Sequence, residues 1–232
     1  MKRALPWLVP LSVLLLWQAA SLVGLLSDQI MPAPSAVALA FWRVAHSGAL
    51  WRDVEISAWR AFAGFAIGGG VGFVFGMLNG LSSLAEKLTD STLQMIRNIP
   101  HLALIPLVIL WFGIGEEAKL FLVALGVFFP IYVNTLHGVR SVDCQLLEMA
   151  RAYGMSECAI FSRVVFPGAL PSIFVGLRYG LGIMWLTLIV AETISASSGI
   201  GFMAMNAREF MMTDVVVVSI LIYAAPGKLA DS

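Results

Sequence analysis

The side chains that could carry out chemistry are few in this sequence, and their spacing argues against catalysis. His46, His101 and His137 are isolated from one another, and Cys144 and Cys158 have no partner at the spacing of a metal site. No paired acids, HExxH motif or other catalytic constellation is visible. We therefore expect no enzymatic activity, no metal and no cofactor, and we expect both cysteines to be reduced thiols.

A nucleotide-binding loop is missing as well. Such a loop needs a glycine, four residues and then Gly-Lys-Ser or Gly-Lys-Thr, so that backbone N–H groups surround the phosphates. Gly227 and Lys228 lack the upstream glycine and are followed by Leu229. If the function is driven by ATP, the hydrolysis must take place on a separate ATPase subunit.

The most informative spacing lies in the charged segment 140–167, which contains EMARAYGMSECAIFSRVVFP. The pattern predicts a short helix over 145–153, a break at Gly154, a second helix from about Ser156, and a stop at Pro167, where a proline can open the next helix. Two short helices would then meet at a glycine elbow. Such a pair can dock in a groove of another protein.

This spacing resembles the EAA loop in permeases of binding-protein-dependent ABC importers, which reads Glu-Ala-Ala, then Gly, then Ile-x-Leu-Pro. The matching positions are Glu148, Ala150, Gly154, Val164, Phe166 and Pro167. Met149, Val164 and Phe166 depart from the family residues by apolar exchanges. The resemblance implies that segment 140–167 is the coupling loop, with Glu148, Ala150 and Gly154 at the contact with the ATPase.

The resemblance covers nearly the whole chain and is greatest to permeases of aliphatic sulfonate importers, followed by taurine, nitrate and thiamine-precursor importers. It is carried by RNIPHLALIPLVILWFGIG, by PGALPSIFVGLRYGLGIMWLTLIVAETISASSGIGFMAMNAREF and by TDVVVVSILIYA. It implies the type I ABC importer permease fold, a homodimer of permeases, two cytoplasmic ATPase subunits and a periplasmic substrate-binding protein. Because the binding protein does most of the selecting, a taurine or nitrate-type permease stays an alternative to the sulfonate permease.

Composition indicates the environment in which these residues are held. Of the 232 residues, 59% are hydrophobic and only 12% are charged, and the mean hydropathy is +0.90. A chain of this kind is surrounded by lipid. Its formal net charge of zero gives no basic excess for binding nucleic acid. We expect an all-α, polytopic membrane protein.

Apolar runs of about 20 residues predict six transmembrane helices. They cover 5–26, 61–81, 98–115, 120–139, 169–191 and the residues from 215 onward. The sixth run meets Pro226 early and spans only about 16 Å as a helix. We expect a first transmembrane helix and a periplasmic interfacial segment over 1–56, followed by a permease domain over 57–232 with a truncated C-terminus.

Positive charge sets the orientation. With the N-terminus inside, nine of the 14 Lys and Arg residues fall on the cytoplasmic side or its membrane edge, which predicts that both termini are cytoplasmic and the protein is a multi-pass inner-membrane protein. Lys2 and Arg3 before an apolar run also fit a secretory signal. A retained first span is the simpler interpretation, because more membrane segments follow it.

Glycine recurs every four residues in the second span, at Gly64, Gly68, Gly72, Gly76 and Gly80. Small residues at this spacing let two helix backbones approach closely in lipid. Packing within one subunit is the favoured interpretation, and a dimer or moving interface is the alternative.

Polar side chains inside a membrane are costly and therefore suggest function. Arg97, Asn98 and Arg178 lie at or within predicted spans, and a path for an anion would benefit from them near its inner mouth. Capping and packing are the competing roles. A secondary transporter is a further alternative, although the related halves and midplane coupling residues typical of that class are not visible.

Overall fold

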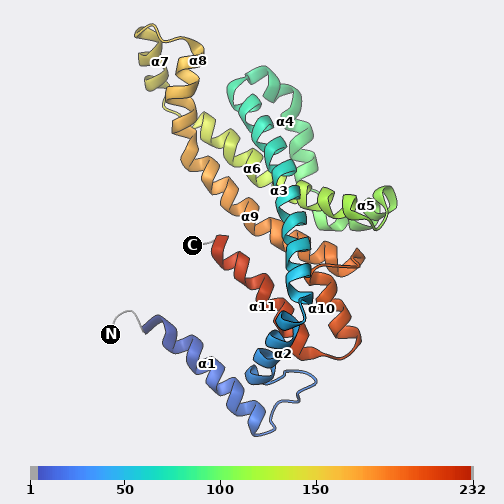
Figure 1. Ribbon diagram of the computed structural model, residues 1–232. Helices are drawn as coiled ribbons and strands as arrows, with labels where there is room; N and C mark the ends of the chain where they lie inside the picture. The colour runs from blue at the N-terminus through green and yellow to red at the C-terminus, as the bar shows by residue number, and fades with distance from the viewer. Residues whose placement is uncertain (1–4, 231–232) are drawn as a thin grey trace. The chain divides into compact units, whose positions relative to one another are not determined.

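The computed structural model describes residues 5–230, which form helices joined by short turns and contain no strand (Figure 1). The all-α prediction is confirmed. The chain divides into two compact units, each built from separate stretches of sequence. The first unit contains Met1–Ala58 and Glu192–Pro226, and the second contains Trp59–Ala191 and Gly227–Ser232.

The first unit combines helices from both ends of the sequence. They are α1 (Leu5–Leu22), α2 (Pro34–His46), the start of α3 (Ala49–Leu81), the end of α9 (Phe166–Ser195), α10 (Ile200–Glu209) and most of α11 (Thr213–Ala230). Pro34 occupies the first turn of α2, where its fixed φ favours the helix. Helix α11 has 18 residues and is about 27 Å long, so the sixth helix is longer than its apolar run alone predicts.

The second unit holds the rest of α3 and α9 and the helices between them. These are α4 (Ser83–Arg97), the 3-10 turn η1 (His101–Leu104), α5 (Ile105–Phe112), α6 (Glu116–Arg140), α7 (Cys144–Ala152), α8 (Glu157–Ile160) and the π-helical turn η2 (Phe161–Val165). The hydroxyl of Ser82 accepts a hydrogen bond from the Ala85 N–H and caps α4. Gly113, at φ +73°, ends α5 in a conformation that costs glycine little.

The predicted glycine column lies against α6 of the same chain. A Cβ at Gly68 would clash with the Ala124 carbonyl oxygen, and one at Gly72 would lie 2.5 Å from that of Phe128. Gly64, Gly76 and Gly80 face α6 in the same way, through Val123, Thr135 and Val139. The glycines therefore set the distance between α3 and α6 within one subunit.

Within residues 5–230, three helical stretches are long and apolar enough to cross a membrane by themselves: Ala49–Leu81, Glu116–Arg140 and Glu157–Ile194. They contain the predicted spans 61–81, 120–139 and 169–191. Leu8–Leu22 and Thr213–Ala225 are shorter apolar helices that correspond to the first and sixth predictions.

The third span differs from its prediction as one helix over 98–115. Neither helix α4 nor the pair η1–α5 is long and apolar enough to cross a membrane alone. Only the two together are, and they are bent by 78° at the break between them. Pro100 lies at this break and has no N–H to continue the helix. The apolar run 98–115 is therefore not one helix, because α4 ends at Arg97 and η1–α5 covers His101–Phe112.

Candidate functional site

Segment 140–167, the predicted coupling loop, folds as a helix, a glycine turn and a second helix. Asp143 caps α7 by accepting a hydrogen bond from the Gln145 N–H at 2.8 Å. Gly154 has φ +74°, which ends α7, and the Met155 N–H donates to the Ala150 carbonyl at 3.1 Å. The hydroxyl of Ser156 then caps α8. The predicted helix, break and second start are confirmed.

The predicted stop at Pro167 is wrong, because α8 continues through η2 into α9 without a break. In η2 the Phe166 N–H bonds back to the Phe161 carbonyl, which widens the turn. Pro167 follows at once, and its missing N–H is accommodated in the wide turn instead of ending the helix. The loop is thus rigidly attached to α9.

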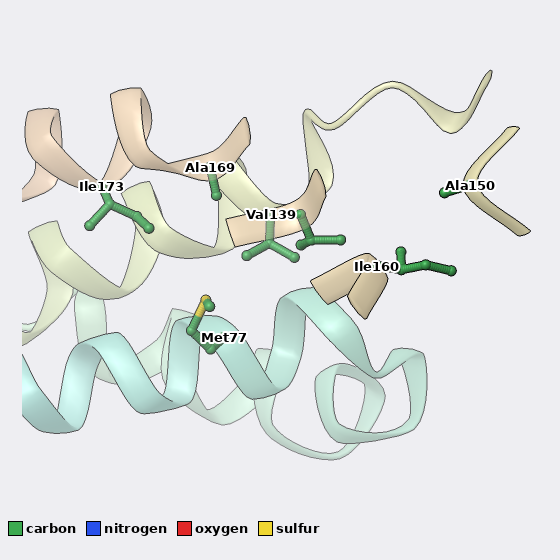
Figure 2. Packing of buried hydrophobic residues seen from close by; sticks show 7 residues of the cluster. Met77, Val139, Ala150, Ile160, Ala169 and Ile173 are labelled. Carbon is green, nitrogen blue, oxygen red and sulfur yellow. The ribbon is translucent and has the colours of Figure 1, made fainter. Parts of the chain in front are cut away.

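Buried apolar residues hold the two short helices together. Ala150 belongs to one buried cluster with Ile160 and Val165. The same cluster contains Met77 of α3, Val139 of α6 and residues of α9, as Figure 2 shows. Val164 and Phe166 are partly buried against the same cluster. Of the predicted coupling residues, Ala150, Val164 and Phe166 therefore stabilise the loop itself.

The outer surface of the loop is exposed and mixed in character. Glu148, Gly154 and Pro167 are exposed, and so are the large apolar side chains of Leu146, Met149 and Tyr153, the last at 80%. We call Glu148 together with Leu146, Met149 and Tyr153 the α7 surface. The sequence pattern pointed to Glu148 but not to Leu146 and Tyr153, which it does not specify, and it treated Met149 only as an apolar exchange.

A cavity of about 350 Å³ with both polar and apolar lining residues lies in the second unit between α4, η1, α6 and α9. Its polar lining residues are Arg97, His101, Asn134 and Tyr179. A second cavity of about 590 Å³ adjoins it, is lined by Arg178 and shares Tyr179 and Ile183 with the first. No described residue lining either cavity is acidic. Both cavities therefore favour negative charge.

The first cavity lies near the middle of its helices. Pro130 and Tyr179, which line it, are close to the centres of α6 and α9. Arg97 ends α4, about 22 Å of helix from Ser83. Arg97, an exposed residue at the end of α4, thus lies beside the middle of α6 and α9.

Thr187 fixes the position of the His101 side chain. Its Nε2 atom shares a hydrogen bond of 2.9 Å with the hydroxyl of buried Thr187. A Cβ at Gly126 would lie 2.9 Å from that hydroxyl and 3.2 Å from Nε2, so only glycine leaves the pair room. His101, Asn134 and Tyr179 were not assigned to the path from the sequence. The bend at Pro100 brings His101 to α6 and α9, and local spacing does not reveal that approach.

The three predicted path residues have different surroundings. Arg97 and Arg178 each line one of the adjoining cavities. The amide of Asn98 donates to the Gln94 carbonyl at 3.0 Å and ends α4. Asn98 therefore has the capping role that was the competing interpretation.

A buried carboxylate in the first unit also escaped sequence reasoning. Glu192 is 1% exposed and accepts hydrogen bonds from the Tyr223 hydroxyl at 2.8 Å and the Gly201 N–H at 2.9 Å. The Ser57 hydroxyl donates to the same carboxylate and accepts from the Ile200 N–H at 2.9 Å. Glu192 thus ties α3, α9, α10 and α11 together at one point.

Residues 68–232 match the family described as binding-protein-dependent transport system inner membrane component. The chain belongs to this family. It is accordingly a transport subunit and not an enzyme, and it occupies the inner-membrane place in systems that also contain an ATPase and a substrate-binding protein. Membership decides against a secondary transporter.

Curated members of the family are similar over almost the full chain. The putative aliphatic sulfonates transport permease protein SsuC of Escherichia coli is 61% identical over 99% of this chain and 87% of that protein. The Bacillus subtilis protein of the same description is 44% identical, over 97% and 82%. The taurine transport system permease protein TauC of Escherichia coli is 34% identical, over 96% and 87%.

Solved structures share the fold at low sequence identity. An amino acid ABC transporter chain superimposes with a TM-score of 0.63, covering 82% of this chain and 94% of that one at 17% identity. A chain of the MetNI methionine ABC transporter, described as inward facing, gives 0.56 over 75% and 90% at 20% identity. The predicted ABC importer permease fold is confirmed.

Proposed function

We propose that this chain is the permease subunit of an ATP-driven importer of aliphatic sulfonates. The coupling loop carries the transport role: its interior is fixed on α9 by Ala150 and Ile160, while the α7 surface presents an acid and apolar side chains to a partner. The substrate class is supported by the two relatives described as aliphatic sulfonate permeases, at 61% and 44% identity.

The working assembly contains two copies of this permease in lipid, two cytoplasmic ATPase subunits and one periplasmic binding protein. An even number of spans brings both termini to one side. The distribution of Lys and Arg places that side in the cytoplasm, together with the coupling loop.

The substrate path runs past Arg97 and Arg178, near the end of α4 at Asn98. A sulfonate is ionised at any physiological pH, so its path needs positive charge where water is scarce. The cavities lined by Arg97 and Arg178 contain no acid among the described lining residues, which supports this assignment.

A taurine permease is the second candidate, because the taurine relative is 34% identical over 96% of the chain. Taurine is itself a sulfonate, so the same cationic path would accept it. Uptake by the reconstituted complex, measured with ethanesulfonate, taurine and nitrate in competition, distinguishes the candidates. Preference for ethanesulfonate supports the proposal, preference for taurine selects the second candidate, and preference for nitrate overturns the sulfonate class.

Co-purification tests the coupling role. Glu148→Lys reverses an exposed charge in the α7 surface without changing buried residues, so the ATPase should be lost while the permease still elutes as a folded dimer. Glu117→Lys, an exposed acid at the opposite end of the second unit, is the matched control and should retain the ATPase. Full retention by Glu148→Lys and by Gly154→Pro would remove the loop from the ATPase contact.

A further inference from the structure

The donor groups around the 350 Å³ cavity come from four different elements. Arg97 ends α4, His101 begins η1 and Asn134 lies on α6, and each lines the same space with Tyr179 of α9. The volume falls at the lower end of small-molecule sites, which are about 300–1,000 Å³. The cavity therefore has the size for one small ligand.

The charge of the lining sets the class of ligand. Arg97 is permanently cationic, and His101, Asn134 and Tyr179 can each donate a hydrogen bond. Because no described lining residue is acidic, nothing within the cavity neutralises the guanidinium. A small oxyanion satisfies these donors, whereas a cation or an apolar ligand does not.

The backbone around the cavity is adapted as well. Pro130 has no N–H, so the helix hydrogen bond to the Gly126 carbonyl cannot form, and Asn134 donates to the Pro130 carbonyl at 2.8 Å. Gly126 at the same wall keeps the His101–Thr187 pair intact, as a side chain there would displace it. These features fix the polar groups before any ligand arrives.

We infer that this cavity in the second unit is an anion-binding station, in which Arg97 supplies the charge and His101, positioned by Thr187, supplies a second contact. The ligand is a small oxyanion of the sulfonate type. The inference rests on the proposed function, since a station for an anion presupposes that the permease moves one. Arg178 lies in the adjoining cavity, beyond the shared Tyr179.

The first test measures access and charge preference with a sulfonate probe. In a full complex carrying Cys144→Ser and Cys158→Ser, Val133→Cys places one thiol in the cavity wall. The anionic reagent 2-sulfonatoethyl methanethiosulfonate is compared with its cationic trimethylammonioethyl analogue. In each case the thiolate attacks the sulfenyl sulfur, a disulfide forms and methanesulfinate leaves. Ser197→Cys, an exposed position outside the cavity, gives the reference rates.

Relative to that reference, the anionic reagent should react faster than the cationic one at position 133. Arg97→Gln should abolish this preference, Arg97→Lys should retain it, and neither should change the rates at position 197. An unchanged preference in Arg97→Gln, or a position 133 that neither reagent reaches, would overturn the inference.

The second test measures ethanesulfonate uptake and ATP hydrolysis together in proteoliposomes with saturating binding protein. Arg97→Gln should lower the uptake per ATP by about tenfold, because a charge-assisted hydrogen bond is lost. A merely structural defect would lower both rates in parallel and would count against the station. If the wild-type complex moves no ethanesulfonate, the proposed substrate is wrong, while the labelling preference still decides the anion site.

Discussion

The hydroxyl of Ser57 lies 2.8 Å and 2.9 Å from the two carboxylate oxygens of Glu192 in the interior of the first unit. Both side chains are buried, and the carboxylate has further donors in the Gly201 N–H and the Tyr223 hydroxyl. A buried carboxylate is stable only when its oxygens are satisfied in this way. Removing any one group of this network leaves a buried partner without its hydrogen bond and destabilises the unit.

Glu192→Ala should lower the thermal stability of the purified permease. Each donor left without an acceptor in the interior costs about 1–3 kcal/mol. Tyr223→Phe removes one donor and leaves the acceptor in place, so it should cost less, about 1 kcal/mol. Thermal unfolding in detergent measures both, and equal melting temperatures for Glu192→Ala and wild type would contradict the role of the network.

Glycine positions on α3 should differ sharply in tolerance. Gly68→Ala drives a methyl group into the Ala124 carbonyl of α6 and should cost about 3 kcal/mol or prevent folding. Gly70→Ala meets open space on the same helix and should be neutral or slightly stabilising, because alanine is the better helix former. Expression and monodispersity of the two variants provide the comparison, and equal behaviour would disprove the α3–α6 contact.

Removing the acid that serves two buried cations should destabilise the second unit. Arg60 and Lys119 are 1% and 2% exposed, and Glu116 accepts from Arg60 at 2.5 Å and 2.6 Å and from Lys119 at 3.1 Å. Because the side chain of Glu116 is itself 55% exposed, solvent screens part of the loss, and we expect about 2 kcal/mol for Glu116→Gln.

The neighbouring Glu117→Gln is the matched control for that change, since Glu117 is exposed and adjoins Glu116 on α6. It should unfold at the wild-type temperature. A larger loss for Glu117→Gln than for Glu116→Gln would contradict the assignment of the cation pair.

Gly154 should tolerate asparagine better than alanine. At φ +74° a Cβ is strained, by about 1–2 kcal/mol for most residues, while asparagine adopts this region more readily. Both variants leave the α7 surface unchanged. Binding of the ATPase should therefore weaken in the order wild type, Gly154→Asn, Gly154→Ala, as measured by co-purification at graded salt. The reverse order would show that the turn does not orient α7.

Much of the fold could be predicted because single features of the sequence determine it. The middle parts of α3, α6 and α9 follow from apolar runs of about 20 residues, although α3 begins earlier than its run, at Ala49, and the run in α9 carries Arg178. The start of α8 after Ser156 follows from a capping residue placed after a glycine. The glycine column predicted close packing without naming the partner helix. Which helix faces a column depends on the whole bundle, and local spacing does not contain that information.

The third span shows where hydropathy fails. Helix α4 carries Glu86, Lys87 and Asp90, so its mean hydropathy is low. Hydropathy therefore did not indicate that this helix leads to the cavity. In the structure Glu86 pairs with Arg140 at the end of α6, and Thr89 accepts from Asn79 at 2.7 Å. These partners, distant in sequence, compensate the polar groups of α4.

The cavity residues were difficult to predict for a related reason. Arg97 was found because charge inside an apolar region is conspicuous in any sequence. His101 and Tyr179 have ordinary local surroundings, and only the bend at Pro100 brings η1 to α6 and α9.

The network around Glu192 also orders events during synthesis. Ser57, Glu192 and Tyr223 come from distant parts of the sequence, so the network cannot close before α11 has been made. A chain that stops short of α11 keeps the carboxylate of Glu192 but lacks the hydroxyl that Tyr223 donates to it. Such a fragment therefore cannot complete the interior of the first unit.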